Sequence, residues 1–306
     1  MPNLPALPGA VAAPQLTQRA LWHWHRLGFT ALALAIALPS AFGAGLSLLD
    51  FPLLAATAML LLGVPHGAFD VALAHRRWEI GTPPALACFL ALYVGMAAAF
   101  AAIWFLLPQF ALPVFIAMSG VHFAGDWRRD IPLLPRMVVG LALITAPALL
   151  HREPVTEIFA WLVPADVAVT TAEVMAAASI PLLQAAALVA LVTAWSRPAA
   201  ALEMAATLLL AVFAAPLVFF VSYWCGLHSA RHVFSVQAEL QPRTLSGLAR
   251  LSLPYAPITI IGVMIAALLW PHLDLGRAVL AVLFVALAAL TVPHMMLVDQ
   301  FRPKRT

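Results

Sequence analysis

Charged side chains are scarce in this sequence. Only 9% of its 306 residues are charged, 64% are hydrophobic, and the mean hydropathy is +0.98. A soluble domain carries about 25% charged residues, so this chain has too few polar side chains to cover a surface that faces water. The scarcity excludes an ordinary soluble protein and indicates an integral membrane protein. Lys and Arg occur singly or in pairs between apolar runs, which argues against a nucleic-acid partner.

Cysteine is also rare. Cys88 and Cys225 both lie in apolar runs and have no CxxC partner, which excludes a disulfide framework and a thiolate metal site. The dipeptide His-His is absent as well. Membrane di-iron desaturases and hydroxylases need several histidine boxes, including such a pair, so this absence argues against that class.

Long apolar runs, by contrast, are abundant, and they predict an all-α, polytopic transmembrane helix bundle. A span needs about 20 apolar residues. We expect about ten spans, with eight as the lower bound, near residues 27–49, 51–74, 83–107, 111–127, 132–150, 174–195, 199–221, 222–240, 251–270 and 276–298. Residues 153–173 are too interrupted to span, and we expect a loop with an amphipathic piece at the membrane interface.

The basic residues predict the orientation of the bundle. If the N-terminus lies in the cytoplasm, most of the 16 Lys and Arg residues face the cytoplasm, and so does the C-terminus. We therefore expect a mobile N-terminal tail over residues 1–25, one helical domain over 26–299 and a basic cytoplasmic tail over 300–306. The expected location is a cell membrane, the inner one in a bacterium.

Five of the ten histidines fall inside predicted spans that all run in the same direction. In each span the histidine lies near mid-membrane or in the inner half, so all five could meet in one layer. Ionisable groups at membrane depth are expensive and usually functional. The five are His66, His122, His228, His232 and His294. The other five lie at predicted helix ends or in loops, and we assign them no chemistry: His23, His25, His75, His151 and His272.

The local spacing of these residues favours a metal site. Residues four apart share one face of a helix, so two imidazoles at that spacing can bind one metal. Three pairs have this spacing: His228 with His232, His66 with Asp70, and His122 with Asp126. A ligating histidine usually donates its other ring N–H to a carboxylate, which makes Asp70 and Asp126 candidates for that role. The alternative for a single histidine, such as His294, is a hydrogen bond to a carbonyl of a neighbouring helix.

Arg231 lies between His228 and His232 on another face and needs a buried anion, for which Asp70, Asp126 and Asp299 are the candidates. Aromatic side chains near the histidine segments could line a lipophilic substrate pocket. The candidates are Phe123, Trp127, Tyr223 and Trp224.

Imidazole ligands without thiolates suit Zn, Cu, Fe or Ni. Two other classes would use the same histidines: an electron carrier with haem held between two helices, and a metal or proton transporter. A transporter needs a polar path across the membrane, and the outer halves of the predicted spans are nearly free of ionisable groups.

Four segments carry a family resemblance. GVPHGAFD, SGVHFAGD, CGLHSARH and TVPHMM resemble the signature segments of the Brp/Blh family of integral-membrane β-carotene 15,15′-dioxygenases, over residues from about 50 to 300. The N-terminal tail and the continuation FAGDWRRD do not match. The resemblance implies central cleavage of β-carotene with O2 into two retinals, and retinal supply to a rhodopsin partner. It also implies Fe(2+) held by His66, His122, His228 and His232, with His294 as a further ligand or an outer-shell residue.

Overall fold

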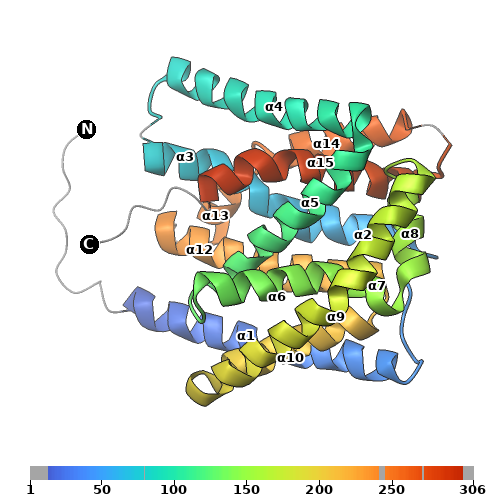
Figure 1. Cartoon of the computed structure of the whole chain (residues 1–306). Coiled ribbons are helices and arrows are strands. Elements are labelled where there is room, and N and C mark those ends of the chain that lie inside the picture. Colours follow the sequence, from blue (N-terminus) through green and yellow to red (C-terminus); the bar gives the residue numbers. More distant parts are fainter. Residues whose placement is uncertain (1–12, 79, 241–244, 271, 299–306) are drawn as a thin grey trace.

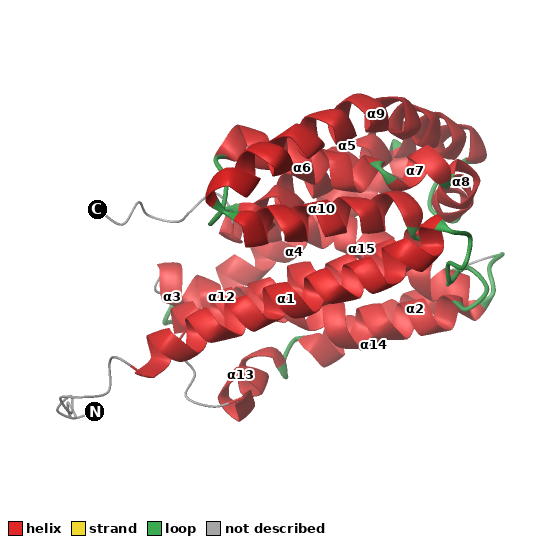
Figure 2. Cartoon of the chain, turned by 90° about the horizontal axis from the view of Figure 1, so that it is seen from below, coloured by secondary structure: helices red, strands yellow, loops and turns green. Residues whose placement is uncertain are grey.

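The structure is a computed structural model, and it describes residues 13–78, 80–240, 245–270 and 272–298. The side chain of His66 lies outside the described part, as do those of a few other helical residues. The described residues form helices and loops, and no strand occurs among them (Figure 2). The predicted all-α fold is confirmed.

The helices follow one another with short connections, and several are continuous with the next (Figure 1). In chain order they are α1 (Ala13–Ala41), α2 (Pro52–Ala58), η1 (Met59–Gly63), η2 (Val64–Phe69), α3 (Asp70–Trp78), α4 (Pro83–Leu106), α5 (Pro108–Phe123), η3 (Ala124–Trp127), α6 (Leu133–Thr145), α7 (Pro147–Leu150), α8 (Arg152–Ala160), α9 (Ala165–Ser196), α10 (Pro198–Phe213), α11 (Pro216–Tyr223), η4 (Trp224–Ser229), α12 (Ala230–Leu240), α13 (Leu245–Ser252), α14 (Ala256–Leu268) and α15 (Leu275–Val298).

Six helical stretches among the described residues are long and apolar enough to cross a membrane: Pro52–Trp78, Pro83–Leu106, Pro108–Trp127, Leu133–Leu150, Ala165–Ser196 and Leu275–Val298. Two shorter apolar helices, Pro198–Phe213 and Ala256–Leu268, accompany them. The chain is therefore an integral membrane protein with several spans. The number ten and the orientation of the termini stay predictions.

Two expected boundaries are wrong. Residues 153–173 do not form a loop, because α8 covers most of the first half and α9 begins at Ala165. Val155, Ile158 and Phe159 are buried, so the apolar face of this short helix packs on the bundle. The expected break after residue 221 lies instead at Ala214 and Ala215, whose extended backbone separates α10 from α11.

The N-terminal boundary also differs from the expectation. Helix α1 begins at Ala13, so the part of the expected tail from 13 to 25 is helical. Residues 1–12 and the expected basic tail over 300–306 lie outside the described residues.

The bundle is held together by close packing of neighbouring helices. Helix α1 packs along α10, α4 along α15, and α6 lies between α5 and α9 (Figure 1). Lipid is as apolar as a core side chain, so small residues that let backbones approach are important for such packing. A Cβ added at Gly140 of α6 would overlap the carbonyl oxygen of Gly120 in α5. Gly120 lies two residues before His122, so α5 and α6 are close together next to this histidine.

The three sequence segments that carry the four predicted ligands all depart from regular α-helix. The π-helix η1 and the 3₁₀-helix η2 precede and include position 66, the 3₁₀-helix η3 follows His122, and the π-helix η4 contains His228. Helices η1 and η4 pack on each other, and a Cβ at Gly63 would overlap the ring of Trp224. Such irregular turns occur frequently at functional sites.

Candidate metal centre

Four buried histidines from four different helical segments meet in the middle of the bundle. His122 ends α5, His228 lies in η4, His232 in α12 and His294 in α15, and each is less than a tenth exposed. The ring centroid of His122 lies 4.7 Å from that of His228 and 5.2 Å from that of His294. The rings of His232 and His294 are also 5.2 Å apart.

Three donor atoms at this cluster are close enough to share one ion. Asp70, His232 and His294 each offer a ligand atom, and these atoms lie within 4.8 Å of one another. His66 follows η1, and its neighbours Val64 and Gly67 line the cavity described below. Its side chain lies outside the described residues, so its role as a ligand stays a prediction.

Each of the two aspartates accepts a hydrogen bond from a histidine of a different segment. The Nδ1 of His294 lies 2.9 Å from both carboxylate oxygens of Asp70. The Nδ1 of His228 lies 3.1 Å and 3.2 Å from the two oxygens of Asp126. An ionised carboxylate only accepts, so Nδ1 carries the hydrogen in both histidines and Nε2 keeps the lone pair that a metal needs. Each aspartate thus orients a histidine of another helix.

The partner of Arg231 is Glu203, a carboxylate that was not among the candidates from the sequence. Nη2 of Arg231 lies 2.6 Å from Oε2 of Glu203 in α10, whose side chain is fully buried. Nη1 donates to the backbone carbonyl of Asp126 at 2.9 Å, not to its carboxylate. The expected partner among Asp70, Asp126 and Asp299 is therefore wrong for the described residues, and Asp299 lies outside them. The sequence does contain a signal for this partner, because Glu203 is a single acidic residue inside the apolar run PAAALEMAATLLLAVF.

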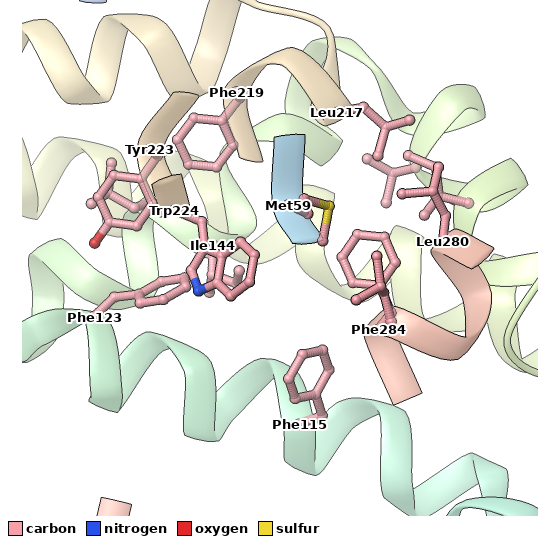
Figure 3. Packing of buried hydrophobic residues seen from close by; sticks show 14 of the residues in the cluster. Met59, Phe115, Phe123, Ile144, Leu217, Phe219, Tyr223, Trp224, Leu280 and Phe284 are labelled. Atoms are coloured by element: carbon pink, nitrogen blue, oxygen red, sulfur yellow. The ribbon is translucent and has the colours of Figure 1, made fainter. Parts of the chain in front are cut away.

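An apolar cavity of about 260 Å³ reaches the cluster from one side. Asp70, His122 and His294 line it, and most of the other lining residues are aliphatic or aromatic. All but one of them come from η2, α3, α4, α5, α11, η4, α14 and α15. Of the four predicted pocket residues, Phe123 and Trp224 line it. Trp127 and Tyr223 are fully buried and do not line it. The ring of Tyr223 lies 4.9 Å from that of Phe123 (Figure 3).

The cavity opens sideways, toward the surface that would contact lipid. Val94 of α4 and Ile258 of α14 both line it, and they are 60% and 67% exposed. The edge of the cavity at these two helices therefore includes exposed apolar side chains. A long apolar molecule dissolved in the bilayer could enter here without crossing water.

A second, polar cavity of about 110 Å³ lies on the other side of the cluster. His122, His228 and His232 line it together with the charged groups of Arg77 and Glu239. The side chain of Glu239 accepts hydrogen bonds at 2.8 Å from Nε and from Nη2 of Arg77, which ties α12 to α3. His122 lines both cavities, so the histidines form the boundary between an apolar and a polar space.

Two histidines to which we assigned no chemistry bond backbone carbonyls. Nε2 of His25 lies 2.8 Å from the carbonyl oxygen of Gly226 in η4, and Nε2 of His151 lies 3.2 Å from that of Phe213 at the end of α10. Both carbonyls belong to positions where the regular helix is disturbed or ends, so these histidines satisfy backbone groups.

Comparison with known proteins points to one family. The sequence model described as "Beta-carotene 15,15'-dioxygenase" matches residues 57–302. A protein of the uncultured marine bacterium 66A03 named β-carotene 15,15′-dioxygenase is 32% identical over 85% of this chain and 96% of its own length. A protein of Halobacterium salinarum named probable β-carotene 15,15′-dioxygenase Blh is 32% identical over 89% of this chain and 90% of its own length. No solved structure matches the chain.

Proposed function

This chain belongs to the β-carotene 15,15′-dioxygenase family, and we propose that it cleaves the central double bond of β-carotene with O2 to give two retinals. The observation that carries the proposal is the buried histidine cluster at the end of an apolar cavity that opens to lipid. The substrate is a long hydrocarbon, so it is expected to approach from the bilayer. Each product aldehyde takes one oxygen atom of O2, so the reaction needs no external reductant.

The residues fit a divalent iron. Neutral imidazoles suit iron, and no thiolate competes, because Cys88 is exposed and the thiol of Cys225 lies 3.7 Å from the carbonyl of Ala58. We assign Fe(2+) to His66, His122, His228 and His232. His294 and Asp70 adjoin His232 closely enough to join the set or to support it. Bound iron would supply the activation of O2 that the cleavage requires.

The protein's own part is to position the alkene and to exclude water. The walls of the apolar cavity hold the polyene in one orientation. The ring of Phe123 lies 5.0 Å from that of His228, and Trp224 lines the same cavity. Figure 3 shows both aromatic side chains. An apolar wall keeps water from the reacting carbons and so prevents side reactions. The cleavage needs no proton transfer from the protein.

Haem binding and transport are the other classes that fit a histidine layer. The family relationship favours neither of them. A location in a bacterial inner membrane, and a rhodopsin that accepts the retinal, remain part of the proposal. They agree with an integral membrane enzyme whose product is lipophilic.

The test is product analysis. We expect purified protein in detergent micelles, loaded with Fe(2+) and supplied with β-carotene and O2, to give two retinals per carotene by chromatography. Samples without O2, or treated with an iron chelator, are the controls and should give no aldehyde. Unequal apocarotenals would indicate cleavage at another bond. No aldehyde from any carotenoid at full iron loading, or a Soret band in the purified protein, would contradict the proposal.

A further inference from the structure

The chain has three tyrosines, and two of them stand in equivalent positions beside the histidine cluster. The hydroxyl of Tyr93 donates to Asp70 at 2.6 Å, and the hydroxyl of Tyr223 donates to Asp126 at 2.6 Å. Each aspartate also accepts from the Nδ1 of a histidine. We call these groups the Asp70 triad (Tyr93, Asp70, His294) and the Asp126 triad (Tyr223, Asp126, His228).

The two triads are built from different parts of the fold. The Asp70 triad joins α4, α3 and α15, and the Asp126 triad joins α11, η3 and η4. The two triads therefore bring together side chains from six different segments. In both, one buried carboxylate is bonded on one side by a phenol and on the other by an imidazole that faces the cluster.

The phenol has a physical role in such a group. A buried carboxylate is stable only when its oxygens accept hydrogen bonds, and bonds to an ionised group are about twice as strong as neutral ones. With the tyrosine in place, the carboxylate cannot rotate away from the imidazole. The Nδ1–H of the imidazole then stays directed at the carboxylate, and the lone pair of Nε2 stays available to a metal.

The triads differ in their contact with the apolar cavity. Tyr93 lines the cavity in the same wall as Val94, whereas Tyr223 is fully buried and does not line it. A molecule in the cavity would therefore touch the ring of Tyr93 and would not touch that of Tyr223. Tyr255 also lines the cavity, as Tyr93 does. Unlike that of Tyr93, its hydroxyl makes no hydrogen bond to a carboxylate among the described residues.

We propose that Tyr93 and Tyr223 are positioning residues that hold the imidazoles of His294 and His228 for metal binding, and that the ring of Tyr93 is in addition a contact surface for the carotenoid. This inference rests on the proposed function for the identity of the substrate. The role in metal binding rests on the hydrogen-bond geometry alone.

Metal titration tests the first part without any turnover. The variants are Tyr93→Phe, Tyr223→Phe and, as matched control, Tyr255→Phe, each of which removes only a hydroxyl. Apo-protein is titrated with Co(II), and its visible absorption bands report both affinity and ligand geometry. Loss of an outer-shell partner typically lowers affinity about 10–100-fold. We expect a decrease in this range and altered bands for the first two variants, with Tyr255→Phe like the wild type.

A second comparison tests the contact with substrate. At saturating iron, Tyr93→Phe keeps the ring and should lower kcat with little change in KM for β-carotene. Tyr93→Leu removes the ring and should raise KM several-fold. Tyr223→Phe should leave KM unchanged.

The possible failures are distinguishable. If Tyr93→Phe and Tyr223→Phe bind Co(II) as Tyr255→Phe does, with the same spectrum, the positioning role is overturned even if the wild type makes retinal. If Tyr93→Leu has the KM of Tyr93→Phe, the substrate contact is wrong. If the wild type yields no aldehyde, the proposed function fails while the metal titration still decides the positioning role. Should a single variant not fold, Asp126→Asn and Asp70→Asn weaken the same hydrogen bonds from the other side, because the neutral amide offers one acceptor oxygen to two donors.

Discussion

Two polar regions lie side by side in this bundle, and they use their carboxylates differently. In the histidine cluster, Asp70 and Asp126 accept from imidazole and phenol groups. In the neighbouring region, Glu203 and Asp130 are paired with guanidinium groups, and we call this region the arginine network (Arg26, Asp130, Arg197, Glu203 and Arg231). It connects α1, α10 and α12.

The difference shows what each region is built for. A guanidinium is always charged and pairs with a carboxylate in fixed geometry, so the arginine network joins helices. Its arginines offer no lone pair that could bind a metal. Imidazole keeps a lone pair when its other nitrogen is held by an aspartate, so the histidine cluster can bind an ion. The regions meet at Arg231, which reaches Glu203 and also the backbone carbonyl of Asp126.

The largest effect is expected at the junction of the two cavities. His122→Ala removes the histidine whose ring faces those of His228 and His294. Because one ligand is lost, most bound iron and most activity should disappear while the protein stays folded. Elemental analysis of the purified protein measures this. His75→Ala, at an exposed position of α3, is the control and should keep its iron. Full iron occupancy in His122→Ala would remove it from the ligand set.

A change in the arginine network should affect stability more than metal binding. Glu203→Ala leaves the buried guanidinium of Arg231 without its carboxylate, and breaking a buried ion pair costs about 3–5 kcal/mol. Thermal unfolding in detergent should show a large loss of stability. Metal affinity of the folded fraction should fall less than in Asp126→Asn. The double variant Glu203→Leu with Arg231→Met replaces both charges and should lose less stability than Glu203→Ala. The opposite order of the two variants would show that the pair is not structural.

Asp126→Asn and Asp70→Asn test the role of the two carboxylates in the histidine cluster. Both keep the side-chain volume and lose the charge that holds an imidazole. Metal affinity should decrease about 10–100-fold, with activity impaired and not abolished. Asp130→Asn is the matched control, because Asp130 belongs to the arginine network and bonds Arg26 at 2.6 Å. Its iron affinity should equal that of the wild type. A similar decrease in iron affinity in all three variants would show that the two regions do not differ in this respect.

The smallest effect is expected at an exposed ion pair, where solvent screens the charges. Asp274 precedes α15 and accepts a hydrogen bond from the backbone N–H of Arg277 at 3.1 Å. This bond, together with the charge of Arg277, lowers the pKa of Asp274 below its ordinary value. Its contribution to stability is therefore present above the ordinary aspartate pKa and is lost as the pH falls through the lowered pKa. Asp274→Ala should cost no more than about 1 kcal/mol near neutral pH, and nothing in acid. Thermal unfolding as a function of pH checks both statements, and a loss that persists in acid would contradict them.

Much of the fold follows from the composition and the length of the apolar runs. A chain with so few charges must place its surface in lipid, and backbone groups in lipid must be bonded within helices, so an all-α bundle is the available solution. The boundaries at residues 153–173 and 214–215 did not follow. Hydropathy does not distinguish a short helix packed on the bundle from a loop, and it gives no signal for the two extended residues that separate α10 from α11.

From the sequence alone, five histidines are predicted to meet in one layer of the membrane, with Asp70 and Asp126 as partners of imidazoles, because the spans that carry the histidines are predicted to run in the same direction. Which of them pair was decided only by the tertiary structure. Asp70 bonds His294, which is 224 residues away, and Asp126 bonds His228, because rotation of each helix about its axis depends on packing such as that of Gly140 against Gly120. The contacts of Tyr93 and Glu203 likewise depend on how the helices pack. Their roles come from the helix they face, and a single sequence carries no record of which faces meet.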